Sequence, residues 1–157
     1  MRIWIDADAC PVAVREIVFR ASRKRRLPVT LVSDRLQPTP NLSWITSVQV
    51  KGGMDAADDY IVEHADSTDL VITHDIPLAA QVLAKGASVL GIRGDTFNAS
   101  TIAERLAARD FMTEVRAMGI QTGGPPPYDD RARAAFANGF DRWLAAAERV
   151  RGEQGGS

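Results

Sequence analysis

Five short apolar segments alternate with longer helical stretches along this chain, and that alternation restricts its fold more than any other feature. The expected strands are residues 2–5, 27–33, 44–50, 69–75 and 87–92. The expected helices are residues 11–26, 56–65, 76–86, 99–118 and 130–150. Strands joined by helices of this length form parallel sheets that are covered on both faces. The sequence therefore predicts an α/β protein with three α/β/α layers and a mainly parallel sheet.

The 157 residues are enough for one domain with one core, which we expect over residues 1–150. The last residues, 151–157 (RGEQGGS), are expected to form a flexible tail. The one cysteine cannot form an internal disulfide, and the charged start MRIWIDADAC lacks the apolar stretch of a signal peptide. No apolar run approaches the ~20 residues that span a bilayer. We therefore expect a cytoplasmic protein without a membrane partner.

Charge is distributed unevenly along the chain, although the net charge is only −1. Residues 55–79 contain several acids and no lysine or arginine. A basic run at the end of the first expected helix includes Arg20, Arg23 and Lys24. We expect these three to contact a substrate phosphate, which would make RNA a partner. The same charges would also complement the dipole at the end of that helix, and both interpretations stay open.

Acidic residues end two of the expected strands. Asp6 and Asp8 follow the first strand, and Asp75 ends the fourth. Ligands bind beyond the carboxyl ends of parallel strands, and neighbouring strands lie only ~5 Å apart. Asp58 shares the inward face of its helix with apolar residues, so it should point toward the same place. We therefore expect Asp6, Asp8, Asp58 and Asp75 to converge at one edge of the sheet.

Four converging carboxylates repel one another unless something neutralises them. At ~4 Å and an effective dielectric constant of about 20, each pair costs roughly 4 kcal/mol. The site must therefore protonate some of these groups or bind cations, and carboxylate oxygens favour Mg²⁺ or Mn²⁺. Such ions activate water and hold phosphoryl groups. The alternative is structural, because an aspartate after a strand often only caps the next helix, as Asp8 could.

Two further side chains stand near these acids in the sequence. Cys10 could be a nucleophile at a helix start, but it has no evident base partner, so a buried or capping cysteine is preferred. His74 could protonate a leaving group, although a histidine that simply ends a strand is the more common case. Neither residue is assigned to the predicted site.

Five blocks of sequence carry a resemblance to a known family. The blocks are IWIDADACPV, GMDAADDYIV, DLVITHDIPLAAQVLAKGA, RDFMTEVRAMGIQTGGP and FANGFDRWL. They closely resemble the YaiI/YqxD family of uncharacterised bacterial proteins. The resemblance extends from residue 2 to about residue 147, and it is specific because the five blocks occur in order at the expected spacing.

The YaiI/YqxD family is in turn similar to PIN-domain nucleases. That similarity implies a PIN-like, Rossmann-like sheet and cleavage of RNA that depends on Mg²⁺ or Mn²⁺. Asp6 matches the PIN aspartate that ends the first strand, and Asp58 and Asp75 match the acids of the DxxI and T-x-D patterns. PIN nucleases carry a further acid on an early helix. The resemblance leaves open whether Glu16 or Asp8 takes that place, or whether the site is incomplete.

The preferred function is a metal-dependent phosphodiesterase that acts on RNA. Asp6, Asp8, Asp58 and Asp75 would be its metal ligands and its catalytic residues. They would position a water molecule for attack on a phosphate, and one of them would take a proton from that water. The resemblance supplies no biochemical activity for the YaiI/YqxD family itself.

Two other functions compete with this one. IDADAC superficially resembles the DxD motif of haloacid dehalogenase-like phosphatases, which would make Asp6 a nucleophile and Asp8 a general acid. Ser33 and Lys85 could then fill further roles. The second alternative is a PIN-like module that binds RNA or a protein without catalysis. A trapped aspartyl-phosphate would favour the phosphatase, and a failure to bind metal would favour the non-catalytic module.

Overall fold

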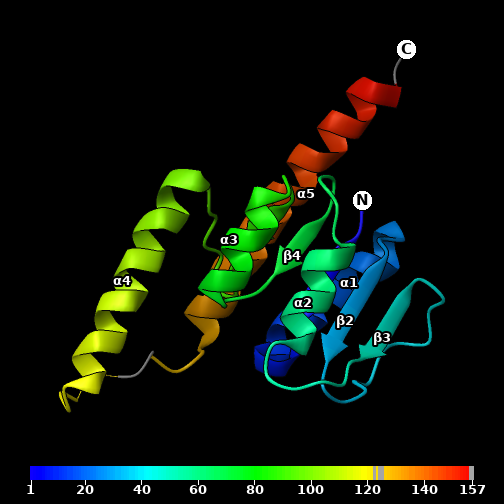
Figure 1. Ribbon diagram of the computed structural model, residues 1–157. Coiled ribbons are helices and arrows are strands. Elements are labelled where there is room, and N and C mark those ends of the chain that lie inside the picture. The colour runs from blue at the N-terminus through cyan, green and yellow to red at the C-terminus, as the bar shows by residue number, and fades with distance from the viewer. Residues whose placement is uncertain (122, 124–125, 156–157) are drawn as a thin grey trace.

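The central sheet of the computed structural model is parallel, as the alternating pattern predicted (Figure 1). The structure describes residues 1–121, 123 and 126–155, and within them five strands pair in the order β3-β2-β1-β4-β5. The strands are β1 (Ile3–Asp6), β2 (Val29–Ser33), β3 (Ile45–Gln49), β4 (Leu70–Ile72) and β5 (Ser88–Leu90). Strand β1 is central and pairs with β2 on one side and β4 on the other. The carboxyl ends of β1 and β4 are therefore neighbours.

Helices cover both faces of this sheet, which confirms the three-layer α/β/α prediction. The helices are α1 (Val12–Arg25), α2 (Ala56–His64), α3 (Ile76–Ala84), α4 (Ala99–Ala117) and α5 (Asp130–Gly155), and a short 3₁₀ helix, η1 (Ala7–Ala9), links β1 to α1. One core cluster joins the sheet to α1 and α5, and a second joins it to α2 and α3. In Figure 1, α2 and α3 lie in front of the sheet, and α1 and α5 lie behind it.

The alternation of side chains along β1 decides which face receives the candidate acids. Ile3 and Ile5 belong to the core cluster of α1 and α5, whereas Trp4 belongs to the cluster of α2 and α3. Successive side chains of a strand point to opposite faces, so Asp6 follows Trp4 to the face of α2 and α3. That is the face on which Asp58 lies, because Asp58 belongs to α2.

Several predicted boundaries differ from the structure, and the strand predicted at 69–75 is limited to Leu70–Ile72. The strand predicted at 87–92 is limited to Ser88–Leu90, because the Gly91 N–H turns to bond the Asp95 carbonyl at 2.8 Å. The last helix does not end at 150 but continues to Gly155, since the residues that follow include good helix formers. Part of the predicted tail is therefore helical, and its last two positions lie outside the described residues.

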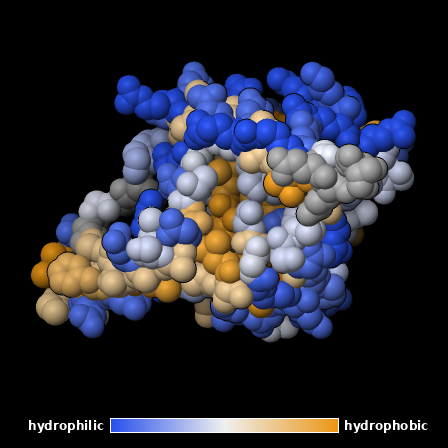
Figure 2. All heavy atoms as spheres, turned by 90° about the horizontal axis from the view of Figure 1, so that it is seen from above, coloured by the Kyte–Doolittle hydropathy of each residue, from blue (hydrophilic) through white to orange (hydrophobic). Residues whose placement is uncertain are grey.

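Helix α4 extends beyond the sheet and packs mainly against α3 (Figure 1). Large apolar side chains are exposed at its far part and directly after it, among them Phe111 and Met118. Figure 2 shows hydrophobic surface on this side of the molecule. Among the described residues, none of the helices combines the length and the apolar character needed to cross a membrane.

Candidate functional site

Asp6 and Asp75 meet at the carboxyl edge of the sheet through the hydroxyl group of Thr73. Thr73 is buried and follows β4, next to the end of β1. Its Oγ1 donates a hydrogen bond to Asp6 Oδ2 at 3.0 Å and accepts one from the Asp75 N–H at 3.0 Å. Both aspartates line one hollow of about 380 Å³, the acidic hollow. Its lining is Asp6, Ala9, His74, Asp75, Ile76 and Arg109.

Asp75 also has a structural role at this edge. Its Oδ1 accepts a hydrogen bond from the Leu78 N–H at 3.1 Å, so Asp75 is the N-cap of α3. Pro77 stands in the first turn of α3, where a missing N–H costs nothing. The capping bond uses only Oδ1, and it leaves Oδ2 for other partners. Capping and ligand binding are therefore compatible at this residue.

Asp58 brings a third carboxylate from α2 to Asp6 and Asp75. Its side chain is half-buried, and burial is the main cause that raises the pKa of Asp58 from 3.8 to about 7. The negative charges of Asp75 and Asp6 raise that pKa further, as does a side-chain hydrogen bond with Asp75. Burial also raises the pKa of Asp6, and the hydrogen bond from Thr73 partly offsets this rise. The three carboxylates therefore act on one another, while their role as metal ligands stays a prediction.

The raised pKa of Asp58 predicts how stability depends on pH. Because the folded-state pKa of about 7 exceeds the ordinary 3.8, the folded protein holds an extra proton between these values. The stability that this proton contributes is complete below about pH 4 and is lost as the pH rises through about 7. We expect Asp58→Asn to raise the Tm at about pH 8, where Asp6, Asp55 and Asp75 repel the ionised Asp58, and to raise it less at about pH 5. Thermal denaturation in EDTA measures both differences, and equal differences at the two pH values would contradict the raised pKa.

Asp8 is bonded to the end of β2. Its Oδ1 accepts hydrogen bonds from Ser33 Oγ at 2.5 Å and from the Asp34 N–H at 3.3 Å. Ser33 is buried, and its hydroxyl oxygen also accepts a bond from Gln37 Nε2 at 3.1 Å. The charge of Asp8 still raises the pKa of Asp6. Asp8 is therefore close to Asp6, but its hydrogen bonds stabilise the loop after β2.

The environment of Cys10 does not favour a cysteine nucleophile, and the position of Lys85 does not favour the phosphatase alternative. Cys10 is buried, and burial raises the pKa of its thiol to about 12, so little thiolate exists near neutral pH. Lys85 donates a hydrogen bond to the Val62 carbonyl oxygen from the C-terminal end of α3. Nine helical residues, about 13 Å, separate that end from the acidic hollow. Lys85 is therefore not brought to Asp6.

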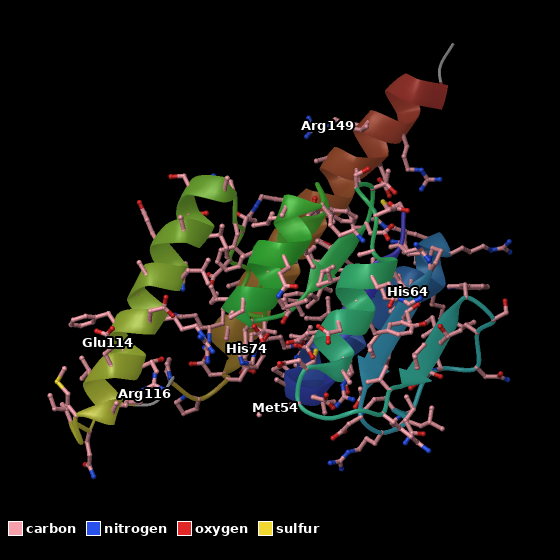
Figure 3. The ribbon with its side chains drawn as sticks, in the orientation of Figure 1. Met54, His64, His74, Glu114, Arg116 and Arg149 are labelled. Carbon is pink, nitrogen blue, oxygen red and sulfur yellow. The ribbon has the colours of Figure 1, made fainter. Side chains whose placement is uncertain are left out.

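His74 borders the acids, whereas Glu16 does not. His74 is exposed and lines the acidic hollow. Figure 3 shows it near the start of α3, at the same end of the molecule as Met54. Glu16 is exposed on α1 and is not among the charges that raise the pKa of Asp6 or Asp58. The further acid that PIN nucleases carry on an early helix therefore has no clear counterpart in Glu16.

The prediction of a metal site at this edge rests on the carboxylates of Asp6, Asp58 and Asp75. Within the described part of the chain, no ion pair involves Asp6, Asp58 or Asp75. Among the same residues, no set of three or more His, Cys, Asp or Glu side chains is arranged so that it could hold a metal ion. The donor chemistry nevertheless fits Mg²⁺ or Mn²⁺, which prefer carboxylate oxygens. Binding would therefore require these side chains to reorient and Asp58 to lose its proton.

The predicted phosphate contacts lie toward the opposite edge of the sheet. Helix α1 begins just after the carboxyl end of β1 and ends at Arg25, next to the start of β2. Its 14 residues extend about 20 Å, so Arg20, Arg23 and Lys24 lie far along it from the acids. Arg25 pairs with Glu148 of α5 at 2.5 Å. The structure therefore does not bring this basic run to the acidic hollow, and its position fits the alternative of a complemented helix dipole.

Other cations do surround the carboxyl edge. Arg15, Arg35 and Lys51 line an open hollow of about 880 Å³ that also includes Asp8, and we call it the basic hollow. Arg109 lines the acidic hollow from α4. These cations come from separate segments of the chain, so no local cluster in the sequence indicates them. Sequence reasoning missed them for that reason.

A parallel three-layer α/β fold with an acidic carboxyl edge defines the class of this protein. The sequence model described as "Uncharacterized BCR, YaiI/YqxD family" matches residues 4–146. The chain belongs to this family, which confirms the resemblance found in its sequence blocks.

Curated relatives match almost the whole chain. The UPF0178 protein of Bordetella petrii is 53% identical over 150 residues, which are 96% of this chain and 100% of the relative. The UPF0178 protein of Xanthomonas campestris pv. campestris (strain 8004) is 51% identical over 144 residues, 92% of this chain and 90% of the relative. The UPF0178 protein of Pseudoalteromonas atlantica is 51% identical over 145 residues, 92% of this chain and 99% of the relative. No solved structure matches the chain significantly.

Proposed function

We propose that this protein is a divalent-metal-dependent phosphodiesterase that cleaves RNA, with Asp6, Asp58 and Asp75 as the ligands of Mg²⁺ or Mn²⁺. The observation that carries this proposal is the grouping of three half-buried carboxylates at the carboxyl edge of the sheet without a cationic partner among the described residues. Such a grouping is unfavourable when all three are ionised, since two ionised carboxylates ~4 Å apart repel by roughly 4 kcal/mol at an effective dielectric constant of about 20. A cation would remove that cost.

The side chains at this edge have complementary tasks in the proposed reaction. The metal ion would supply Lewis acidity toward a phosphate oxygen and toward a water molecule. The Thr73 hydroxyl donates a hydrogen bond to the Asp6 carboxylate and accepts one from the Asp75 backbone N–H, so it fixes the carboxylate of the first beside the backbone of the second. Burial and the neighbouring acids raise the pKa of Asp58 to about 7 in the metal-free protein, so a bound cation would ionise it, and the ionised carboxylate would accept a proton from the attacking water. Asp8 would support this site indirectly, because its carboxylate accepts a hydrogen bond from the Ser33 hydroxyl.

The cations beside the acids support a polyanionic substrate. The basic hollow places Arg15, Arg35 and Lys51 next to Asp8, and Arg109 reaches the acidic hollow from the other side. Phosphate contacts by such side chains provide most of the affinity of nucleic-acid-binding proteins. An RNA chain across this edge would contact cations before and after the acids. The one cysteine, which is free and buried, suits an RNA-cleaving enzyme of the reducing cytoplasm.

Binding of Mn²⁺ is the first expected result. Because the ion must displace the proton of Asp58, its affinity should increase from about pH 6 to about pH 8. We expect Mn²⁺ to raise the Tm of the protein and Asp6→Asn to abolish most of this rise. Isothermal calorimetry and thermal denaturation measure the two effects. The control is Asp59→Asn, an exposed acid on the same helix as Asp58.

Cleavage of RNA separates this proposal from its two alternatives. The proposed enzyme cuts RNA in Mn²⁺, loses activity in EDTA, and forms no covalent phosphate adduct. A phosphoryl group trapped on Asp6 and detected by mass spectrometry would favour the phosphatase instead. RNA binding without any metal binding or cleavage would favour the non-catalytic module and would contradict the proposal.

A further inference from the structure

A third hollow lies next to the acidic hollow, and we propose that it binds one nucleobase of the RNA. It has a volume of about 300 Å³, which is at the lower end of small-ligand pockets. We call it the base pocket, and its lining includes His74, Ile76, Ile92, Asp95, Phe97 and Arg105. The proposal rests on the proposed function for its substrate, but the pocket can be tested without cleavage.

The lining of the base pocket has the chemistry that a nucleobase requires. The Phe97 ring belongs to this lining, and the guanidinium of Arg105 lies over it, with the guanidinium carbon 5.5 Å from the ring centroid. Unpaired bases stack on aromatic rings and on guanidinium planes, while Ile76 and Ile92 provide apolar walls. Asp95 Oδ2 pairs with Arg105 at 3.4 Å, which leaves Oδ1 to accept a hydrogen bond from a base N–H group.

The loop that forms one wall of the base pocket is held in place without a ligand. The Gly91 N–H bonds the Asp95 carbonyl at 2.8 Å, and the Gly94 N–H bonds the Gly91 carbonyl at 3.0 Å. Gly94 has a φ of 84°, a conformation that favours glycine. The Tyr128 hydroxyl donates to the Ile92 carbonyl oxygen at 2.7 Å. A preformed wall reduces the ordering cost of binding.

The base pocket and the acidic hollow share two lining residues, His74 and Ile76. Arg105 lines the pocket and Arg109 the hollow, and residues four apart on a helix share one face. Figure 3 shows His74 near the start of α3, on the side of α4. A nucleotide whose base occupies the pocket would therefore extend its phosphate toward Arg109 and Asp75.

Titration with mononucleotides in EDTA tests the base pocket independently of any metal. The ¹⁵N-labelled protein is titrated with AMP, GMP, CMP and UMP, and with ribose 5-phosphate as a probe without a base. We expect at least one mononucleotide to shift the amide signals of Gly91 and Ile92, and ribose 5-phosphate to shift them much less. Phe97→Leu keeps apolar bulk but removes the aromatic ring from the pocket and from beneath the Arg105 guanidinium, and it should weaken binding roughly tenfold.

The matched control is Phe111→Leu, which removes an exposed aromatic ring from α4 away from the pocket. It should bind mononucleotides as the unmodified protein does. The proposal is overturned if none of the four mononucleotides shifts the two amides, if ribose 5-phosphate shifts them equally, or if the two leucine variants behave alike. Because metal is absent, these outcomes are distinguishable from a failure of the phosphodiesterase proposal, which concerns Mn²⁺ binding and cleavage.

Discussion

Asp75→Asn is expected to reduce Mn²⁺-dependent cleavage of RNA by roughly 10³-fold, because a lost metal ligand removes several kcal/mol of transition-state stabilisation. The fold should survive this change. Asparagine is as good an N-cap as aspartate, so the bond from the Leu78 N–H to the side chain at position 75 can be kept. The measurement is kcat/KM on a fluorescent RNA at saturating Mn²⁺, together with the Tm of the variant.

The matched control for this prediction is Asp59→Asn. Asp59 is an exposed acid on α2, directly after Asp58, so it changes the charge near the site without touching it. Its cleavage rate should stay within about twofold of the unmodified protein, since an exposed charge is largely screened by salt. Equal activity of Asp75→Asn and Asp59→Asn would refute the assignment of Asp75 as a ligand.

Asp69→Ala is expected to lower the free energy of unfolding by about 3–5 kcal/mol, because each N–H donor left without a partner in the interior costs about 1–3 kcal/mol. Asp69 is almost fully buried at the amino edge of the sheet. Its carboxylate accepts hydrogen bonds from the Arg2 N–H at 2.8 Å, Trp4 Nε1 at 2.9 Å and the Asp66 N–H at 3.1 Å. It also pairs with the Arg2 side chain at 3.5 Å. Alanine would leave these donors without partners in the interior.

Chemical denaturation measures this loss, and the Tm should fall by roughly 10 °C for a chain of this length. Asp69→Asn should be intermediate, because an amide keeps one acceptor oxygen for the buried donors. Asp59→Ala serves as the control and should leave stability nearly unchanged. A loss no larger for Asp69→Ala than for Asp59→Ala would show that this carboxylate does not join β1 to the loop before β4.

The sequence was sufficient to predict the layers, the parallel sheet and the edge at which the acids lie. The five apolar segments correspond to the five strands of the described residues because period and length distinguish strands from helices over short distances. The grouping of Asp6, Asp58 and Asp75 followed from strand ends and from one helix face. This grouping could be predicted because each acid stands at the boundary of an element or on the apolar face of a helix, and the local sequence shows both features.

The contacts between segments could not be predicted in the same way. Thr73 joins Asp6 to Asp75 only because β1 and β4 are neighbours in the sheet, and sequence does not give that order. Asp8 is drawn to the end of β2 by the buried hydroxyl of Ser33, 25 residues further along the chain. The role of Asp69 could not be predicted either, because its hydrogen-bond partners Arg2 and Trp4 are also distant from it in the sequence.

The basic residues show most clearly where local reasoning fails. The run with Arg20, Arg23 and Lys24 is prominent in the sequence, but α1 carries it away from the acids toward the amino edge. Isolated cations such as Arg15 and Arg109 reach the carboxyl edge instead. A helix that connects two parallel strands runs back from the carboxyl edge to the amino edge of the sheet. Residues at the end of such a helix, such as this basic run, therefore lie away from the acids.

The central claim is that three carboxylates from distant segments hold one divalent cation at the carboxyl edge of the sheet. Anomalous diffraction from a crystal soaked in Mn²⁺ at about pH 8, where Asp58 is ionised, tests it most directly. We predict a manganese peak bound by oxygens of Asp6 and Asp75, with Asp58 in contact either directly or through a water molecule. A saturated crystal with no manganese at this edge, or with manganese held only by other residues, would contradict the account.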